Sequence, residues 1–428
     1  MNEQRDTTFS ILKALAILLV VTAHAAAPTY LSRFAYMVSV PAFFVCAGYF
    51  FNPQYLQQKG TFVVRRARRL YLPFVKWSLL FLVLHNLFFP LGLLSETYGN
   101  AAGGVTHPYD WHTAMQNVWS IVFNMSGYDV FLAGAFWFFR ALLLSSIAFL
   151  LLFKGATCIK WLKNPTLQVA AVGTLTLLLA IWQSFDGLRI TGVAQGGYRE
   201  LMGITFMSIG FLFRHNTDSP VSVAWRHPAL GLAWSSLILA LLVAFFSVAM
   251  TPSTGNPLAV VLLALAGPTA FVWLHAVAHY LSLLPRKVPE VIAYIGDNSI
   301  YIFGFHLLAF KLVSMIKVLA YGLPWEMVGN HPVVTFQRDD AFWIAYLLVG
   351  AGLPLLVVWS WRYFCAQFDF NWTRPADWGR LFLTISVGIW TGMKWLGRSS
   401  VRTSKKTAHG IAVTFKDIVT QSRTDDDN

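Results

Sequence analysis

The stretch SILKALAILLVVTAHAAAPTY at residues 10–30 decides the fold, because a single charged residue, Lys13, interrupts a long apolar run. A helix needs about 20 predominantly apolar residues to cross the hydrocarbon core of a bilayer. A second run, FAYMVSVPAFFVCAGYFFN at 34–52, follows almost at once. Two such runs in succession predict a helical integral membrane protein.

The composition of the whole chain supports this prediction. Apolar residues make up 56% of the 428 residues, and charged residues only 12%. A soluble domain carries about 25% charged residues, because its surface faces water. Soluble enzymes, disordered chains and fibrous proteins are therefore excluded. The three cysteines, Cys46, Cys158 and Cys365, show no CxxC spacing, so neither a disulfide framework nor a zinc site is indicated.

Further apolar stretches recur along the chain. They fall at roughly 10–30, 34–52, 70–94, 131–153, 166–184, 200–214, 228–250, 257–281, 291–321 and 341–364. The stretch at 200–214 is short, and the stretch at 291–321 is long enough to be tilted or broken. The predicted fold class is all-α, a polytopic integral membrane protein with about ten transmembrane helices.

The formal charge of +13 reflects topology and not nucleic-acid binding, because the charges are unevenly distributed between loops. With the N-terminus in the cytoplasm, the inside loops hold Lys59, Arg65, Arg66, Arg68, Arg69, Lys154, Lys160, Lys163, Arg214, Arg226, Arg286 and Lys287. The outside loops hold Arg33, Arg189, Arg199 and Arg338. Cytoplasmic loops carry the excess of Lys and Arg in membrane proteins. Both termini are therefore predicted to be cytoplasmic.

Two domains are predicted: a membrane domain at 1–365 and a cytoplasmic segment at 366–428. Within the latter, 376–397 is apolar enough to span, but an eleventh span would export the basic tail that follows it. An interfacial helix at 376–397 with a disordered basic tail fits better. The outside segment 95–130 contains VWSIVF at 118–123 and is interpreted as an amphipathic surface element.

The N-terminus has a competing interpretation as a cleaved signal peptide. Arg5, an apolar run and then AHAAAP have the order of such a signal. Lys13 lies well inside the apolar run, and a second span follows directly. Both features favour an uncleaved first helix.

Polar residues inside spans indicate function, because a charge in lipid costs several kcal/mol. Lys13 and His24 are eleven residues apart. That separation is about 1,100° of helical rotation, so the two side chains share a face to within about 20° and lie about 16 Å apart along the axis. The alternative is that Lys13 snorkels to the interface while His24 bonds a neighbouring helix.

Three other groups of residues are candidates. Arg65, Arg66, Arg68 and Arg69 border a span, where they set topology or bind anionic lipid, or hold phosphate through their guanidinium forks. Arg140 lies too deep in its span to snorkel, so we expect it to face a polar cavity or a carboxylate. His306 is a comparable buried imidazole, with Asp297, Asn298 and Ser299 at the start of its span.

Metal, nucleotide and hydrolase signatures are weak or missing in the sequence. His275 and His279 have the i, i+4 spacing that can bind a metal, but neither an HExxH glutamate nor a third ligand accompanies them. No metal is therefore expected. The sequence also contains no GxxxxGK[ST] loop, GxSxG elbow or dinucleotide fingerprint.

Five blocks of the sequence together resemble the membrane acyltransferase family 3 proteins. KALAILLVVTAH at 13–24 is similar to the family's Arg/Lys-x10-His signature, and PAFFVCAGYFF at 41–51 to its "FFxxSGF" block. RRARRLYLP at 65–73 and GAFWFF at 134–139 resemble its Arg-rich entry and its "xxWFL" segment, and IGDNSIYIFGFH at 295–306 its "IGxxSxxIYxxH" block. The blocks occur in the family's order.

The sequence also departs from the family pattern at four positions. Ser10 replaces the usual acidic residue, Ala14 the usual Gly and Ala47 the usual Ser. Lys13 replaces the commoner Arg, as in the sugar O-acetylase branch that resembles fucose 4-O-acetylase. These changes leave the predicted fold intact but weaken inference about the orientation of His24.

The resemblance implies transfer of an acyl group from acyl-CoA, most often acetyl-CoA, to a hydroxyl of a cell-envelope glycan or glycolipid. The implied location is the bacterial cytoplasmic (inner) membrane, as a multi-pass protein among membrane lipids. Arg65, Arg66, Arg68 and Arg69 would hold the CoA phosphates. His24 would act as general base, with Lys13, Arg140 and His306 as further catalytic candidates. Direct transfer and an acyl-His intermediate both remain open.

Two other functional classes also remain open. A transporter or flippase for a lipid-linked glycan would line its path with His24, Arg140 and His306. It would also be expected to show inverted repeats, and none is clear in the sequence. A non-catalytic membrane scaffold would make no demand on Lys13 or His24. Turnover of acyl-CoA with a glycan acceptor separates all three classes.

Overall fold

The computed structural model describes residues 7–367 apart from 101–103, 187–188, 217–223, 225, 252–254 and 338–339. The described residues form helices and no named β-strand, as the all-α prediction requires. The expected interfacial helix at 376–397 and the tail lie outside the described residues, as does Arg338.

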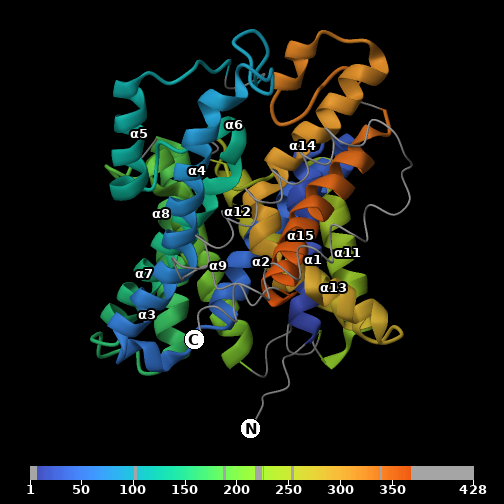
Figure 1. The fold of residues 1–428 in the computed structure, drawn as a ribbon. Coiled ribbons are helices and arrows are strands. Elements are labelled where there is room, and N and C mark those ends of the chain that lie inside the picture. Colours follow the sequence, from blue (N-terminus) through green and yellow to red (C-terminus); the bar gives the residue numbers. More distant parts are fainter. Residues whose placement is uncertain are drawn as a thin grey trace, which may run out of the picture. The chain divides into compact units, whose positions relative to one another are not determined.

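Nine helices among the described residues are long and apolar enough to cross a membrane, and each coincides with a predicted span. They comprise α1 (Thr7–His24), α2 (Thr29–Tyr49), α3 to α4 (Lys59–Phe88), α6 to α7 (Val130–Ala156), α8 (Pro165–Asp186), α11 (Pro228–Phe245), α12 (Pro257–Ser282), α14 (Ser299–Tyr321) and α15 (Phe342–Gln367). The protein is a multi-pass membrane protein. Figure 1 shows these helices packed side by side in residues 7–355.

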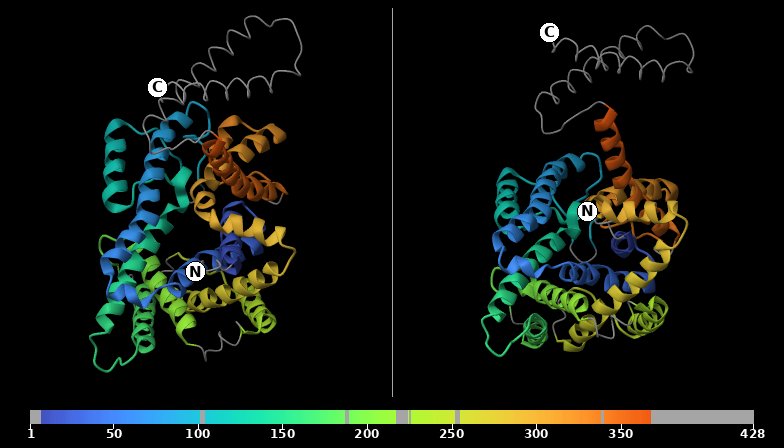
Figure 2. Two further views of the ribbon diagram at one scale, coloured as in Figure 1. Left: turned by 60° about the horizontal axis from the view of Figure 1, so that its bottom comes forward. Right: turned by 90° about the horizontal axis from the view of Figure 1, so that it is seen from below.

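The tenth predicted stretch, 200–214, forms α9 (Tyr198–His215) but is not among the nine candidate spans. Its first turn carries Arg199 and Glu200 and its last turn Arg214, which makes the helix less apolar. Most of its side chains are buried inside the protein. α9 therefore packs as a core helix against α2 and α8 (Figure 2).

The long stretch at 291–321, which was predicted to be either tilted or broken, is broken. α13 (Lys287–Asp297) ends at Asn298, and α14 begins at Ser299. The segment 95–130 also contains the predicted amphipathic element, as α5 (Trp111–Asn124). Trp111, Trp119 and Phe123 on α5 are exposed.

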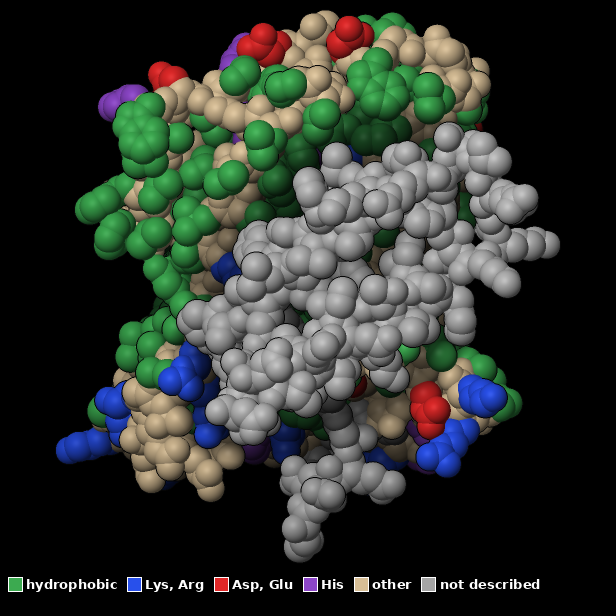
Figure 3. Space-filling view, viewed as in Figure 1, with side chains coloured by type: hydrophobic (Ala, Val, Ile, Leu, Met, Phe, Trp, Pro, Cys, Tyr) green, Lys and Arg blue, Asp and Glu red, His purple; other side chains and the backbone are tan. Residues whose placement is uncertain are grey.

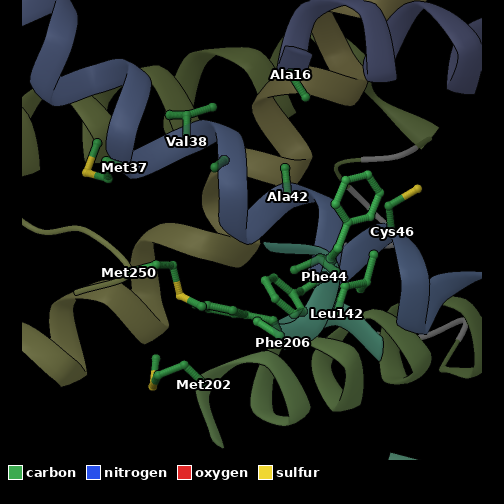
Figure 4. Packing of buried hydrophobic residues seen from close by; sticks show 14 of the residues in the cluster. Ala16, Met37, Val38, Ala42, Phe44, Cys46, Leu142, Met202, Phe206 and Met250 are labelled. Carbon is green, nitrogen blue, oxygen red and sulfur yellow. The ribbon is translucent and has the colours of Figure 1, made fainter. Parts of the chain in front are cut away.

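The core between α2 and α9 is built from large apolar side chains and close backbone contact. Figure 4 shows Phe44 of α2 beside Phe206 of α9, and both belong to the same buried apolar cluster as Met37, Val38 and Met202. Glycines bring the two helices together. A Cβ on Gly48 would overlap the Met207 carbonyl, and a Cβ on Gly210 would overlap the Val45 carbonyl.

Replacing Gly210 with Ala is expected to destabilise the protein by about 1–3 kcal/mol, because the added methyl meets backbone that cannot move aside. The matched control is Gly155→Ala on α7, where a Cβ meets open space. That control should be neutral or slightly stabilising, since Ala favours helix over Gly. Thermal unfolding in detergent measures both changes. Equal melting temperatures for the two variants would contradict the close α2–α9 packing.

The surface of the described protein separates charge from apolar side chains. Figure 3 shows a broad apolar band with most of the visible Lys and Arg gathered along its lower edge, where acidic and His side chains also occur, and with acidic and His side chains along its upper edge. α3 (Lys59–Arg66) and the start of α13 contribute basic residues to the lower edge. Lys and Arg thus gather at one edge of the apolar band, and the cytoplasmic location of that edge stays a prediction.

Candidate functional site

An apolar cavity of about 130 Å³ lies among α1, α2, α7 (Trp137–Ala156) and α14. His24 supplies an imidazole to its wall, Ser299 a hydroxyl and Trp137 an indole. The other lining residues are Ile17, Val20, Val40, Phe43, Leu70, Ala135, Phe138, Phe139, Ile300 and Phe303. Such a wall suits a thin apolar ligand that meets one proton-exchanging group.

His24 is the last residue of α1, and its ring is held in one orientation. Nδ1 lies 2.8 Å from the carbonyl oxygen of Val20, so Nδ1 carries the hydrogen and donates to that carbonyl. Nε2 is then the nitrogen with a free lone pair. The His24 ring lies 5.3 Å from that of His306 between centroids, and 5.8 Å from that of Tyr36.

Lys13 pairs with Asp297 at the end of α13, with 3.4 Å between Nζ and Oδ1. The same oxygen accepts a hydrogen bond of 2.8 Å from the Ser10 hydroxyl. Gly296 permits this contact, because a Cβ there would overlap the Ser10 carbonyl. Lys13 thus faces α13 and His24 faces α14. That the two side chains share one face of α1 stays a prediction.

The arginine cluster lies on a π-helical turn, η2 (Ala67–Tyr71), between α3 and α4 (Leu72–Phe88). Such turns are frequent at functional sites. Arg65 donates to the Tyr55 hydroxyl at 3.0 Å, and Arg66 lies over the Phe62 ring at 5.2 Å. Arg68 and Arg69 are exposed and make neither a hydrogen bond nor an ion pair within the described part of the chain.

The next residue along that turn connects the cluster to the cavity. Leu70 is buried and forms part of the cavity wall, directly after Arg68 and Arg69. The backbone that carries Arg68 and Arg69 is therefore held beside the wall that also carries His24.

Arg140 faces a carboxylate, as predicted, and not the cavity. Its Nε lies 3.9 Å from Glu200 Oε1, and both side chains are largely buried. Arg140 is not among the residues that line the cavity. The neighbouring Arg199 stacks over the Trp137 ring at 3.7 Å and donates to the Met250 carbonyl at 3.0 Å. Arg199 was expected in an outside loop, but it lies in the first turn of α9.

The two histidines with metal-like spacing do not join other ligands. His275 packs its ring against Phe9, with 5.8 Å between centroids. Within the residues that the structure describes, no group of three His, Cys, Asp or Glu side chains could hold a metal ion.

A buried ion pair outside the cavity was missed by the sequence analysis. Nδ1 of His85 contacts Oδ2 of Asp129, and both side chains are fully buried. The other ring nitrogen, Nε2, lies 2.9 Å from the His107 carbonyl. Both nitrogens face acceptors, which fits a charged imidazolium beside a carboxylate. The ring also stacks on Tyr109 at 3.7 Å, and burial raises the pKa of that phenol.

Asp129 also fixes the start of the segment that forms the cavity wall. Its Oδ1 accepts hydrogen bonds from the backbone amides of Phe131 at 2.7 Å and Leu132 at 3.1 Å. It therefore caps α6 (Val130–Ala133), which leads through η3 (Gly134–Phe136) into Trp137. His85, a polar residue in the middle of the predicted span 70–94, was the available sequence signal.

Comparison with known proteins places this chain among acyltransferases. A family model described as an acyltransferase domain matches residues 7–336. The chain is 28% identical over 248 residues to the peptidoglycan O-acetyltransferase OatA of Listeria monocytogenes. That match covers 53% of this chain and 37% of the relative, so the chain spans well under half the relative's length. No solved structure matches.

Proposed function

The chain belongs to acyltransferase family 3, and on this premise we propose that it transfers an acetyl group from acetyl-CoA to a hydroxyl of a cell-envelope glycan. The main support for this proposal is the position of His24. Its imidazole lies on the wall of the apolar cavity, and its Nδ1 donates a hydrogen bond to the Val20 carbonyl. The relative OatA is a peptidoglycan O-acetyltransferase, which supports a cell-wall glycan as acceptor.

The chemistry assigned to His24 follows from its tautomer. Nε2 removes the proton from the attacking hydroxyl while the hydroxyl oxygen bonds to the thioester carbon. The carbon–sulfur bond then breaks, and the imidazolium returns the proton to the leaving CoA thiolate. The products are the ester and free CoA, so protons balance within one cycle. An acyl-His24 intermediate would use the same nitrogen as nucleophile, and both routes need Nε2 unprotonated.

The donor is proposed to enter from the edge that carries the arginine cluster. CoA is a polyanion with a long thin arm. Arg68 and Arg69 are free to bind its phosphates, and Leu70 places the arm at the cavity wall. In this proposal the Lys- and Arg-rich edge is cytoplasmic, both termini are inside, and the membrane is the bacterial inner membrane.

The other predicted site residues take supporting roles in the proposal. Lys13, paired with Asp297, ties α1 to α13 on the donor side of His24. Arg140 pairs with Glu200 and thereby holds α7 against α9. Residues 1–365 are proposed as the catalytic membrane domain and 366–428 as a cytoplasmic segment.

Donor binding is tested by single Gln replacements in the arginine cluster. Arg68→Gln or Arg69→Gln should weaken acetyl-CoA binding by about 1.5–3 kcal/mol, as expected for a charge-assisted hydrogen bond. Arg65→Gln should cost less, because Arg65 already donates to Tyr55. Calorimetric titration of the purified protein with acetyl-CoA, and in parallel with dephospho-CoA, measures these changes.

The matched control is Lys160→Gln, an exposed cation distant in sequence from the cluster. The arginine variant that weakens acetyl-CoA binding most should weaken dephospho-CoA binding less. If all four arginine variants bind acetyl-CoA like the wild type and insert normally, the cluster serves only topology.

A further inference from the structure

His306 has a buried nitrogen with no partner in the described structure. The side chain is 0% exposed, and its Nδ1 lies 3.1 Å from the Ile302 carbonyl and 3.0 Å from the Phe303 carbonyl. Nδ1 therefore carries the hydrogen, and Nε2 presents a lone pair. Nε2 is buried and makes no hydrogen bond to any described residue. A buried acceptor in this state is satisfied only by a donor that the described residues do not supply.

His331 presents a second nitrogen of the same kind. It follows η5 (Trp325–Gly329) in the loop between α14 and α15, and its ring packs 5.3 Å from that of Phe131. One ring nitrogen is engaged by the backbone of Phe131, while Nδ1 is buried without a hydrogen-bond partner. Burial, with the nearby Lys311 charge, lowers the pKa of His331 to about 3. His331 is therefore neutral near pH 7.

The loop that carries His331 is held firmly in place. Lys311 of α14 donates through Nζ to the carbonyls of Val328 at 2.8 Å and Asn330 at 3.1 Å. Gly134 leaves room for the ring, since a Cβ there would lie 3.3 Å from His331 Nε2. The position of His331 is thus part of the built structure and not of a free loop.

The three imidazoles form one group of hydrogen-bond acceptors. His24 and His306 are 5.3 Å apart between ring centroids, and His331 lies within electrostatic range of both. Each ring has one nitrogen committed to a backbone carbonyl, so each offers only a lone pair on the other. The group lacks donors of its own. It is complementary to a ligand that brings several O–H donors.

We propose that His306 and His331 form the acceptor subsite and bind hydroxyls that neighbour the one attacked, so that the acceptor must be a polyol such as a sugar ring. His24 Nε2 takes the reacting hydroxyl, while His306 Nε2 and His331 Nδ1 accept from other hydroxyls of the same molecule. A monohydric alcohol would leave both acceptors unpaired. This inference rests on the proposed acyl transfer, and it adds the residues that select the acceptor.

The tautomers of His306 and His331 can be tested by a measurement that does not depend on enzyme activity. Nitrogen-15 spectra of histidine-labelled protein in detergent micelles should show the hydrogen of His306 on Nδ1 and that of His331 on Nε2. Signals are assigned by single replacements, His306→Gln and His331→Asn. A hydrogen on Nε2 of His306 or on Nδ1 of His331 would turn the supposed acceptor into a donor and overturn the proposal.

Acceptor selection is tested by kinetics with methyl glycosides of glucose and N-acetylglucosamine, their monodeoxy analogues and cyclohexanol. Of the two parent glycosides, the one that the wild type uses better is the reference substrate. Its KM should be roughly 3- to 10-fold lower than the KM of at least one of its deoxy analogues, because that analogue lacks one hydrogen bond to the subsite. His306→Ala and His331→Ala should raise the parent KM by a similar factor and remove that discrimination. His306→Gln and His331→Asn, which retain an acceptor atom, should recover part of it.

The matched control is His215→Ala on α9, whose Nδ1 makes the same bond to the carbonyl four residues back, at 2.9 Å from Phe211. It should leave the parent KM unchanged. If the wild type acetylates parent, deoxy glycosides and cyclohexanol alike, or the His306 and His331 variants keep the parent KM, the subsite is absent. If no alcohol of any kind is acetylated, the proposed acyl transfer is wrong. The nitrogen-15 spectra still test the tautomers of His306 and His331 in that case.

Discussion

His24→Ala is expected to lower kcat for acetyl transfer by roughly 10²- to 10⁴-fold, the usual contribution of general acid–base catalysis. The structure supplies the reason. His24 lines the cavity, and its bond to Val20 leaves Nε2 as the proton acceptor. Imidazole is also the group whose ordinary pKa suits proton exchange near neutral pH. Rates of the reconstituted protein with acetyl-CoA and a glycan acceptor measure the change.

Acetyl-CoA affinity should change little in this variant, because the proposed phosphate contacts come from Arg68 and Arg69. The matched control is again His215→Ala, which removes an exposed imidazole from α9. A His24→Ala protein that folds and keeps more than about a tenth of the wild-type kcat would exclude His24 as the base at this magnitude. The role would then pass to His306, whose ring lies 5.3 Å away.

His85→Ala is expected to reduce stability by about 3–5 kcal/mol, because it strands the Asp129 carboxylate in a fully buried position. The stacked Tyr109 ring would lose its partner as well. Activity should fall with stability, since Asp129 caps α6 and α6 leads into the cavity wall. Thermal unfolding in detergent measures the loss.

The sharper form of this experiment compares two variants. The double change His85→Leu with Asp129→Asn removes the buried charge together with its partner, so it should be more stable than His85→Ala alone. The Asn side chain can still accept from the amides of Phe131 and Leu132 at the start of α6. If His85→Ala melts within a degree or two of the wild type, the pair is not the buried ion pair described here.

Features that repeat within one helix could be predicted from the sequence. The spans follow from apolar runs, and the shared face of Lys13 and His24 follows from helical geometry alone. The length of the stretch 291–321 predicted either a tilt or a break, and the structure shows the break. In each case the physical cause acts within a short piece of chain.

Features that depend on which helices meet could not be predicted. Nothing near Arg140 in the sequence identifies Glu200 as its partner, and nothing near His24 points to His331. The pairing of Lys13 with Asp297 brings together residues 284 positions apart. The charged residues Lys311 and Lys317 inside a predicted span could have been flagged, but not the carbonyls or carboxylate that they bind.

Following a labelled acetyl group distinguishes acetyl transfer from glycan transport. The purified protein is reconstituted in sealed proteoliposomes, and acetyl-labelled acetyl-CoA and peptidoglycan oligosaccharides are added. The glycan is then recovered and its label measured. For an acetyltransferase we expect alkali-labile acetyl label on glycan hydroxyls and release of free CoA in equal amount, both lost with His24→Ala. Glycan that crosses the membrane without acquiring label would contradict the account and identify the protein as a transporter.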